Sequence, residues 1–388
     1  MPETVDSQTA RRLLEHFEGR RDEILSLTRA LCEVESPSGD AAGSRAVVEL
    51  LVRATQGFDG LASVERIPDA GDYGEHLRAR AFEGAARPLL MLGHTDTVHP
   101  RGTLAARPWR ESGARIYAPG VFDMKASCAL AVGVLRACGE LGQRPRRPLV
   151  LLLTCDEEAG SFGGRALVEE EARRAEYVLV LEPPAPGGRA KTARKGTGLF
   201  TLRAVGRAAH AGLEPEKGAS AVHELARQIG RVCALAEPGR GTTVNVGVVR
   251  GGTRANVVAE QAEAEIDVRF ATNEEARRVG QAIAGARPFD ERVRLSVEGG
   301  INRPPLERTP RVVELFEKAR AAAAALDFEL GETSVGGASD GNFAAACGAA
   351  VLDGLGVDGD GAHAAHEHIQ ADSVVRRGAL LAALVLTL

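Results

Sequence analysis

The chain has 388 residues, of which 44% are hydrophobic and 26% charged, a composition typical of globular proteins. This length predicts two domains, and the formal net charge of -5 argues against nucleic acid as the main partner. No apolar stretch reaches the roughly 18–20 residues of a membrane helix, and the polar start lacks the apolar segment of a signal peptide. The six cysteines show no CxxC spacing, so we expect a cytoplasmic protein with reduced thiols and no membrane contact.

The first half of the chain alternates short apolar runs with helical patterns. The apolar runs, typical of strands covered on both faces, lie at 88–92, 149–154 and 177–181. Apolar residues at helical spacing lie at 11–33, 46–54, 126–141 and 165–174. This order predicts an α/β fold with a largely parallel sheet flanked by helices, in which ligands bind beyond the carboxyl ends of the strands.

The pattern changes after the Pro/Gly-rich segment 183–188. Strands are expected at 199–205, 243–249, 262–270 and 293–297, and helices at 216–235 and 274–284. After a turn at 302–305 the helix-rich α/β pattern returns. We therefore predict a discontinuous catalytic domain, residues 1–190 and 303–388, with an inserted α+β domain at 191–302.

Five separate segments place metal-seeking side chains just after apolar runs. They contain His94 with Asp96, Asp123, the acidic run 156–158, Glu182, and His363. Two imidazoles and three carboxylates suit two neighbouring divalent ions, and this set of nitrogen and oxygen ligands, with no thiolate, fits zinc, manganese or cobalt.

Each segment also has a simpler interpretation. His94 and Asp96 share one face of an extended segment, so the carboxylate can support the imidazole, yet the pair also fits a polar loop rim. Asp123 also fits a helix N-cap. Three consecutive acids repel one another unless cations are present, and one of them can take a proton from water, but a solvated acidic loop is the alternative. His366 and His368 lie close to His363, so the loop alone does not decide which histidine is the ligand.

In this order the segments resemble the superfamily of dinuclear zinc amidohydrolases and exopeptidases. Acetylornithine deacetylase, succinyl-diaminopimelate desuccinylase, aminoacylase and bacterial glutamate carboxypeptidase belong to it. The resemblance extends from about Leu25 to the C-terminus and is carried by residues 90–98, 118–125, 154–161, 206–212, 251–257 and 336–341.

The resemblance implies a set of site residues. The implied ligands of two divalent ions, zinc or alternatively cobalt or manganese, are His94, Asp123, Glu158, Glu182 and His363, with Asp123 bridging. Glu157 would be the general base and Asp96 would support His94. The implied substrate-binding residues of the inserted domain are His210, Asn256 and Arg269. The family places its last histidine four or five residues before a glutamate, here Glu367, which selects His363 over His366.

The resemblance also implies the reaction. We expect a metal-bridging hydroxide to cleave the amide bond of a small peptide or N-acyl amino acid with a free carboxylate. Two features favour the glutamate carboxypeptidase branch: residues 194–200, and a glutamate at position 182, where aminopeptidase-like relatives often have aspartate. One alternative is an N-acyl amino acid deacylase. Another is a non-catalytic metal-binding protein, but the chain retains Glu157 and all the ligands, which argues against it. The resemblance further implies a homodimer through the inserted domain, with His210 acting on the partner subunit's site. The remaining histidines, expected on the surface or on polar helix faces, are His16, His76, His99 and His223.

Overall fold

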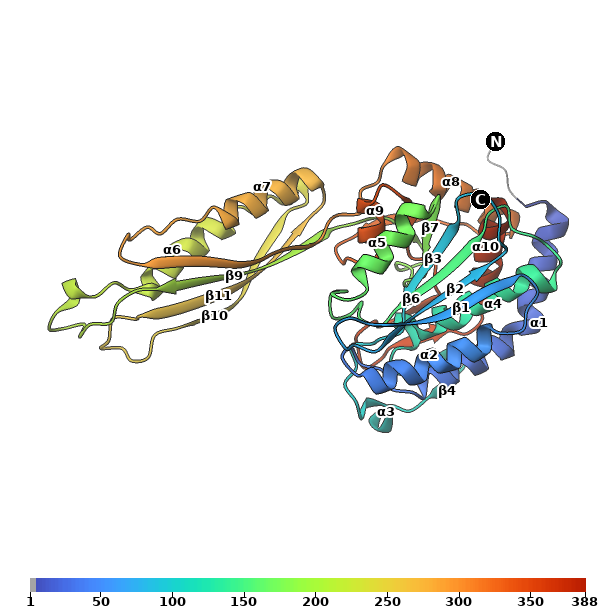
Figure 1. Cartoon of the computed structure of the whole chain (residues 1–388), viewed down its shortest axis with the longest axis horizontal. Helices are drawn as coiled ribbons and strands as arrows, with labels where there is room; N and C mark the ends of the chain where they lie inside the picture. Colours follow the sequence, from blue (N-terminus) through green and yellow to red (C-terminus); the bar gives the residue numbers. More distant parts are fainter. Residues whose placement is uncertain (1–4) are drawn as a thin grey trace. The chain divides into compact units, whose positions relative to one another are not determined.

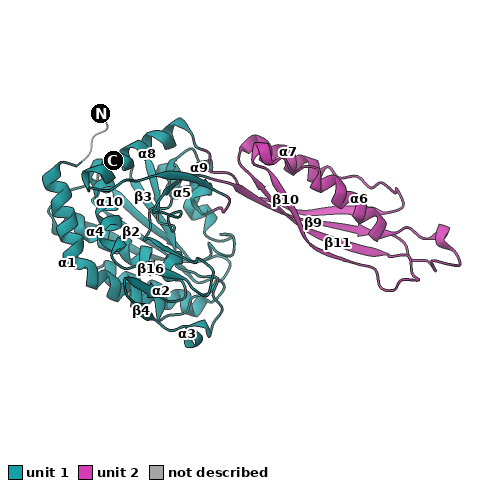
Figure 2. Cartoon of the chain, turned by 180° about the vertical axis from the view of Figure 1, so that it is seen from behind, with its two compact units in different colours: residues 1–193, 308–335, 339–388 teal, residues 194–307, 336–338 magenta. Residues whose placement is uncertain are grey.

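The structure is a computed structural model that describes residues 5–388; residues 1–4 of the polar N-terminal segment lie outside the described part. The chain divides into two compact units (Figure 2). The first comprises residues 1–193, 308–335 and 339–388, and the second comprises residues 194–307 and 336–338. The chain therefore leaves the first unit after residue 193 and returns at 308, where the sequence had predicted boundaries at 190 and 302.

A six-stranded sheet in the order β1-β2-β6-β3-β7-β14 forms the centre of the first unit (Figure 1). Its strands are β1 (Leu61–Pro68), β2 (Glu75–Ala81), β3 (Leu89–His94), β6 (Leu149–Thr154), β7 (Tyr177–Val180) and β14 (Ala350–Leu352). β3 pairs in parallel with both β6 and β7, and β14 continues the parallel part beyond β7. The predicted α/β class with a largely parallel sheet is confirmed, whereas the antiparallel strands β1 and β2 were not predicted.

The helices of the first unit pack through apolar faces, except the four-residue helix at 103–106, which has no buried residue (Figure 1). They are α1 (Ser7–Cys32), α2 (Ala41–Thr55), α3 (Thr103–Ala106), α4 (Ala126–Glu140), α5 (Arg165–Arg174), α8 (Pro310–Ala325), α9 (Gly341–Ala346) and α10 (Ser373–Thr387). The Asp6 side chain caps α1 by accepting the N–H of Thr9 at 2.7 Å. The buried face of α1 includes Leu13 and Phe17. α1 packs on α4 and α10, and α5 packs on α9.

A second, small sheet brings two distant loops of the first unit together. Its order is β15-β16-β5-β4, from Gly359–Asp360, His368–Gln370, Arg115–Tyr117 and Arg110–Ser112. β16 pairs antiparallel with β5, with His368 opposite Tyr117. The chain leaving β5 and the chain entering β16 therefore lie at the same end of this pair. A further pair of strands consists of β8 (Ala190–Arg194) and β13 (Glu332–Val335).

The second unit is an antiparallel sheet with two helices over one face (Figure 1). Its elements are β9 (Gly196–Val205), α6 (Ala221–Cys233), β10 (Thr243–Gly251), β11 (Gln261–Phe270), α7 (Asn273–Ala284) and β12 (Arg294–Arg303), and the strand order is β10-β11-β9-β12. The predicted helix start at 216 is wrong, because Pro215–Lys217 forms a separate 3-10 turn and Ser220 caps α6 by accepting the N–H of His223 at 3.2 Å. The predicted turn at 302 instead begins inside β12.

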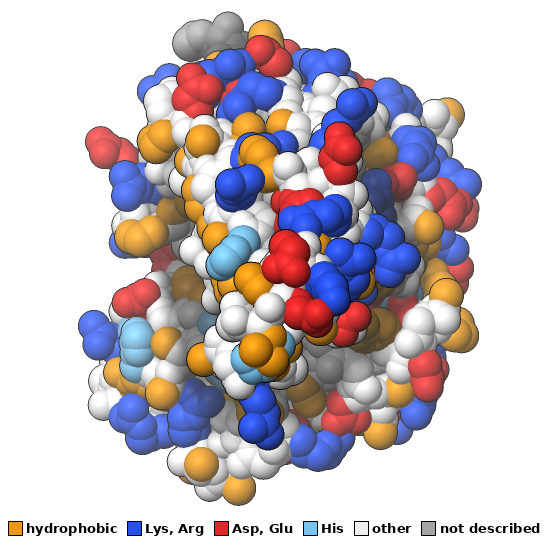
Figure 3. All heavy atoms as spheres, turned by 90° about the vertical axis from the view of Figure 1, so that its left-hand side faces the viewer, with side chains coloured by type: hydrophobic (Ala, Val, Ile, Leu, Met, Phe, Trp, Pro, Cys, Tyr) orange, Lys and Arg blue, Asp and Glu red, His pale blue; other side chains and the backbone are white. Residues whose placement is uncertain are grey.

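The surface mixes charges of both signs. The face drawn in Figure 3 shows acidic and basic side chains next to one another. On the second unit, Arg203 pairs with Glu263 and Glu298, each at 2.7 Å. Exposed pairs of this kind contribute little to stability, because water and salt screen them. Within residues 5–388, no helix has the length and apolar character needed to cross a membrane.

Candidate metal centre

Three parallel strands deliver the first side chains of the site. β6, β3 and β7 are neighbours, and their carboxyl ends meet at one edge of the sheet. His94 is the last residue of β3, Glu157 and Glu158 follow β6, and Glu182 follows β7. The His94 imidazole is 1% exposed, and its Nε2 lies 3.4 Å from Oε1 of Glu182.

Asp123 enters from the turn before α4. Its Oδ1 lies 3.2 Å from Nε2 of His94, and the peptide bond that follows it is cis. Met124 then packs directly against β3 at Gly93, where an added Cβ would come within 2.5 Å of the Met124 Cε. Glycine at position 93 therefore permits the close approach that places Asp123 beside His94.

His363 meets the other oxygen of Asp123. Its Nε2 lies 3.3 Å from Oδ2 of Asp123 and 3.1 Å from Oε1 of Glu158. Its backbone has a φ of 64°, and it lies in the loop between β15 and β16. His366 is exposed, and His368 is buried with its Nδ1 3.0 Å from the His366 carbonyl oxygen. The two carboxylate oxygens of Asp123 thus face two different imidazoles, and each imidazole has a further carboxylate beside it.

Asp96 positions several residues of the site through hydrogen bonds. It is 2% exposed, and its carboxylate accepts the backbone N–H groups of Glu157 at 3.2 Å and Glu158 at 3.1 Å. Ser38 donates its hydroxyl to the same carboxylate at 2.5 Å. The Nδ1 of His94 lies 3.0 Å from the Asp96 carbonyl oxygen and 3.4 Å from its carboxylate. Asp96 therefore contacts His94 and also holds the acidic loop, and this second contact was not predicted.

These hydrogen bonds define which nitrogen of His94 faces the carboxylates. Because Nδ1 points at the Asp96 carbonyl, it carries the proton of a neutral imidazole, and the Nε2 lone pair points toward Asp123 and Glu182. Candidate ligand atoms of His94, Asp123 and Glu158 lie within 4.8 Å of one another, as do those of His94, Glu157 and Glu182. The donor set of nitrogen and carboxylate oxygen therefore fits divalent ions such as zinc.

Charge at the site also fits a cation centre. Burial opposes protonation of His94, but hydrogen bonds to Asp123, Asp96 and Glu182 outweigh it and raise its pKa well above the ordinary value. Asp123 and Glu158 raise the pKa of His363 to about 10. Burial raises the pKa of the Glu158 carboxyl. The five carboxylates of this site, Asp96 included, outnumber its two imidazoles, so bound cations would balance the excess negative charge.

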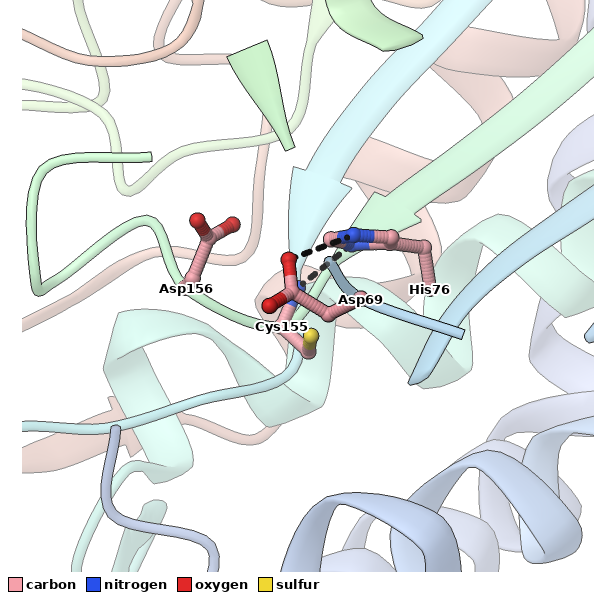
Figure 4. Close-up of side chains that lie close together, drawn as sticks. All are labelled: Asp69, His76, Cys155 and Asp156. Atoms are coloured by element: carbon pink, nitrogen blue, oxygen red, sulfur yellow. Dashed lines mark hydrogen bonds and ion pairs between the residues drawn. The ribbon is translucent and has the colours of Figure 1, made fainter. Parts of the chain in front are cut away.

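A neighbouring buried group contains Asp69, His76, Cys155 and Asp156 (Figure 4). The N–H of Cys155 donates to Nδ1 of His76 at 3.2 Å, so a neutral His76 carries its proton on Nε2, which donates to Asp69 at 3.1 Å. A metal ion at Nε2 would need the lone pair there, so this bonding favours a positioning pair over a second metal site. One oxygen of Asp156 accepts two backbone N–H groups of the following loop at 2.8 and 3.1 Å.

Two of the predicted substrate residues lie together in the second unit. His210 and Asn256 belong to paired backbone segments, since His210 forms a bridge with Val257 and the Asn256 carbonyl accepts the N–H of Ala211 at 3.0 Å. Both side chains are exposed. The loop N–H groups of Gly212 and Leu213 donate to Nδ1 of His210 at 3.2 and 3.1 Å, so its neutral form presents Nε2–H as a donor.

Arg269 lies elsewhere in the same unit. The chain from Asn256 enters β11 at Gln261, and Arg269 lies near the other end of this strand. Arg269 is eight positions along the strand from Gln261, about 26 Å at the usual rise per residue. Its guanidinium is engaged by both oxygens of Asp267 at 2.8 Å. The structure therefore groups His210 with Asn256 and does not bring Arg269 to them.

Comparison with known proteins identifies the family. Residues 90–387 match peptidase family M20/M25/M40. The chain belongs to this family. Carboxypeptidase G2 of Pseudomonas sp. (strain RS-16) is 30% identical, over 96% of this chain and 91% of its own length. Succinyl-diaminopimelate desuccinylase of Alkalilimnicola ehrlichii is 31% identical, over 90% and 94%.

Solved structures share the fold of this M20-family chain. The aminopeptidase PepT of Bacillus cereus superposes with a TM-score of 0.78 at 23% identity, covering 95% of this chain and 98% of its own. A metallo-carboxypeptidase of the M20 family from Sulfolobus solfataricus gives a TM-score of 0.69 at 16% identity, covering 94% and 99%. The family match and the sequence relatives make the chain a hydrolytic enzyme of a family whose members generally bind metal ions.

Proposed function

We propose that this chain hydrolyses the amide bond of a small peptide or N-acyl amino acid that ends in a free carboxylate. The observation that carries the proposal is the placement of Asp123, with one oxygen 3.2 Å from His94 and the other 3.3 Å from His363. A carboxylate placed in this way is suited to bridge two ions, one also held by His94 and Glu182, the other by His363 and Glu158.

The ions would supply the electrophilic part of the chemistry. Divalent ions such as zinc polarise a carbonyl oxygen and lower the pKa of a water toward about 7. Glu157 would take the proton of the attacking water and pass it to the leaving amine. Its position supports this role, because Glu157 is 7% exposed, its N–H is fixed by Asp96, and its side chain lies with His94 and Glu182 in one group.

The second unit would supply the substrate contacts. His210 presents Nε2–H as a donor suited to the developing oxyanion, an interaction worth about 3–4 kcal/mol in comparable donor deletions. Asn256 would contact the substrate beside it, and Arg269 the substrate carboxylate. The separation of Arg269 from His210 within one unit supports a homodimer in which His210 and Asn256 serve the partner subunit's site.

Replacement of Glu157 by glutamine tests the mechanism. The variant should bind the same amount of zinc as the natural enzyme and lose about 10²–10⁴-fold in kcat, since its amide cannot accept the proton. Full activity of a zinc-replete Glu157→Gln enzyme would overturn the role of this residue.

A substrate panel separates carboxypeptidase from deacylase activity. The likeness to carboxypeptidase G2 over 96% of this chain favours peptides that end in glutamate, and the likeness to succinyl-diaminopimelate desuccinylase favours N-succinyl substrates. We expect the glutamate-terminated peptides to give the higher kcat/KM. A higher value for N-acetyl or N-succinyl amino acids would assign the deacylase function instead. If the zinc-loaded protein hydrolyses none of these substrates, a non-catalytic binding protein is favoured.

A further inference from the structure

A buried carboxylate lies next to the proposed metal centre without being one of its ligands. Glu367 is 2% exposed and follows His363 in the same loop. We infer that Glu367, held in place by His99, is a positioning residue that fixes the turn carrying Asp123. This inference rests on the proposed function, since it assigns Asp123 to the metal centre.

The carboxylate of Glu367 accepts four hydrogen bonds. Its Oε1 accepts the backbone N–H groups of Phe122 at 2.9 Å and Asp123 at 3.0 Å. Its Oε2 accepts the N–H of Gly120 at 2.8 Å and faces Nε2 of His99 at 2.6 Å. Three of the four donors belong to the turn between β5 and α4. One side chain from the His363 loop thus sets the backbone of the Asp123 loop.

The turn needs such an external acceptor because its backbone is irregular. Gly120 has a φ of 71°, and Asp123 and Met124 have φ/ψ values of -119°/90° and -138°/40°, outside the helical region. A regular helix would satisfy its interior N–H groups with its own carbonyls. Here Glu367 takes that role for Phe122 and Asp123, and a buried N–H left unpaired would favour another backbone conformation. A shift of the turn would move the Asp123 carboxylate away from His94.

A second contact fixes His99 relative to the loop that carries His363 and Glu367. Arg107 donates to Nδ1 of His99 at 3.3 Å and to the carbonyl of Ala364 at 3.2 Å, next to His363. Because Nδ1 of His99 accepts this bond, a neutral His99 carries its proton on Nε2 and donates it to Glu367. The antiparallel pairing of β5 with β16 places both loops at one end, where Glu367 can reach across. The arrangement therefore couples the position of Asp123 to that of His363.

The affinity for Zn²⁺ alone tests this inference without any substrate. Titration of the metal-free, full-length protein against a chromophoric chelator should show Glu367→Gln binding zinc about 10–100-fold more weakly than the natural chain, the usual effect of losing a group that orients metal ligands. Glu171→Gln is the matched control, because Glu171 is 1% exposed and paired with Arg78 and Arg80 at 2.8 and 2.5 Å. We expect the control to lose thermal stability and to keep its zinc affinity within about twofold.

His99→Phe provides a second variant that retains the Glu367 carboxylate. It removes one donor and fills a similar volume, so we expect roughly tenfold weaker zinc binding, at the low end of the same range, and a changed visible spectrum of the Co²⁺-loaded protein. Natural-level zinc affinity in both Glu367→Gln and His99→Phe would overturn the inference, as would an equal loss in Glu171→Gln. If the natural chain itself binds no zinc, the proposed metal centre is wrong; if it binds zinc and the variants match it, only the positioning role fails.

Discussion

Replacing Asp96 with alanine removes the acceptor of two backbone N–H groups at once, those of Glu157 and Glu158. Leaving a buried donor unpaired costs about 1–3 kcal/mol, with the full cost at the buried Glu157 and less at the partly buried Glu158. The metal-free protein should therefore lose about 2–4 kcal/mol of unfolding free energy. Zinc affinity should fall by about tenfold, the low end for a group that supports a ligand, because alanine keeps the backbone carbonyl that faces His94.

Urea unfolding followed by tryptophan fluorescence measures the first effect. Trp109 is the single tryptophan of the chain and lies in the first unit, so its signal reports on the unit that contains the site. Ser38→Ala is the control, since it removes one donor to Asp96 and leaves both N–H groups paired; its loss should stay near 1 kcal/mol. An Asp96→Ala protein within about 0.5 kcal/mol of the natural one would show that these two hydrogen bonds do not stabilise the loop.

Three further outcomes are expected. Zinc binding to the metal-free protein should strengthen as the pH rises toward about 10, because the raised pKa of His363 keeps this ligand protonated below that pH. At pH 8, zinc binding should therefore release about one proton from His363. Calorimetric heats of binding that do not vary with the ionisation enthalpy of the buffer would contradict this. Arg278 lowers the pKa of Glu275 to about 2, so the stability that Glu275 contributes is present above its unfolded pKa of 4.5 and is lost as the pH falls toward 2. The stability gap between the natural chain and Glu275→Gln should therefore close in acid, and a gap independent of pH would refute the assignment. Mixing inactive Glu157→Ala with inactive His210→Ala should restore part of the activity if His210 acts across a dimer. No recovery after proven subunit exchange would mean that His210 serves its own chain or is only structural.

The strands that the sequence predicted well are those buried on both faces. β3, β6 and β7 are continuous apolar runs, and their parallel order follows from the helices between them. β1 and β2 were missed because charged residues interrupt them, and only the folded sheet shows that Arg78 and Arg80 are neutralised by Glu171. Tertiary ion pairing of this kind leaves no local periodic signal.

The gathering of the site side chains was also predictable, but the groups that hold them were not. Strand ends at one sheet edge are enough to expect His94, Glu158 and Glu182 near one another. The expectation that His76 and His99 lie on the surface is wrong, since they are 3% and 7% exposed. Each is buried against a carboxylate, and the partner of His99 is 268 residues away along the chain. No local pattern reveals a pair of that separation.

The placement of His363 has a consequence for how the protein is made. Roughly 180 residues, including the whole second unit, are synthesised between Glu182 and His363, which takes about 10–35 s at typical rates of translation. Until β14 and β16 emerge and join strands formed from the first half of the chain, the nascent polypeptide holds only His94, Asp123, Glu158 and Glu182. The complete set of proposed ligands arises only when the last elements dock, so the second of the two proposed ions would be bound tightly only at the end of folding.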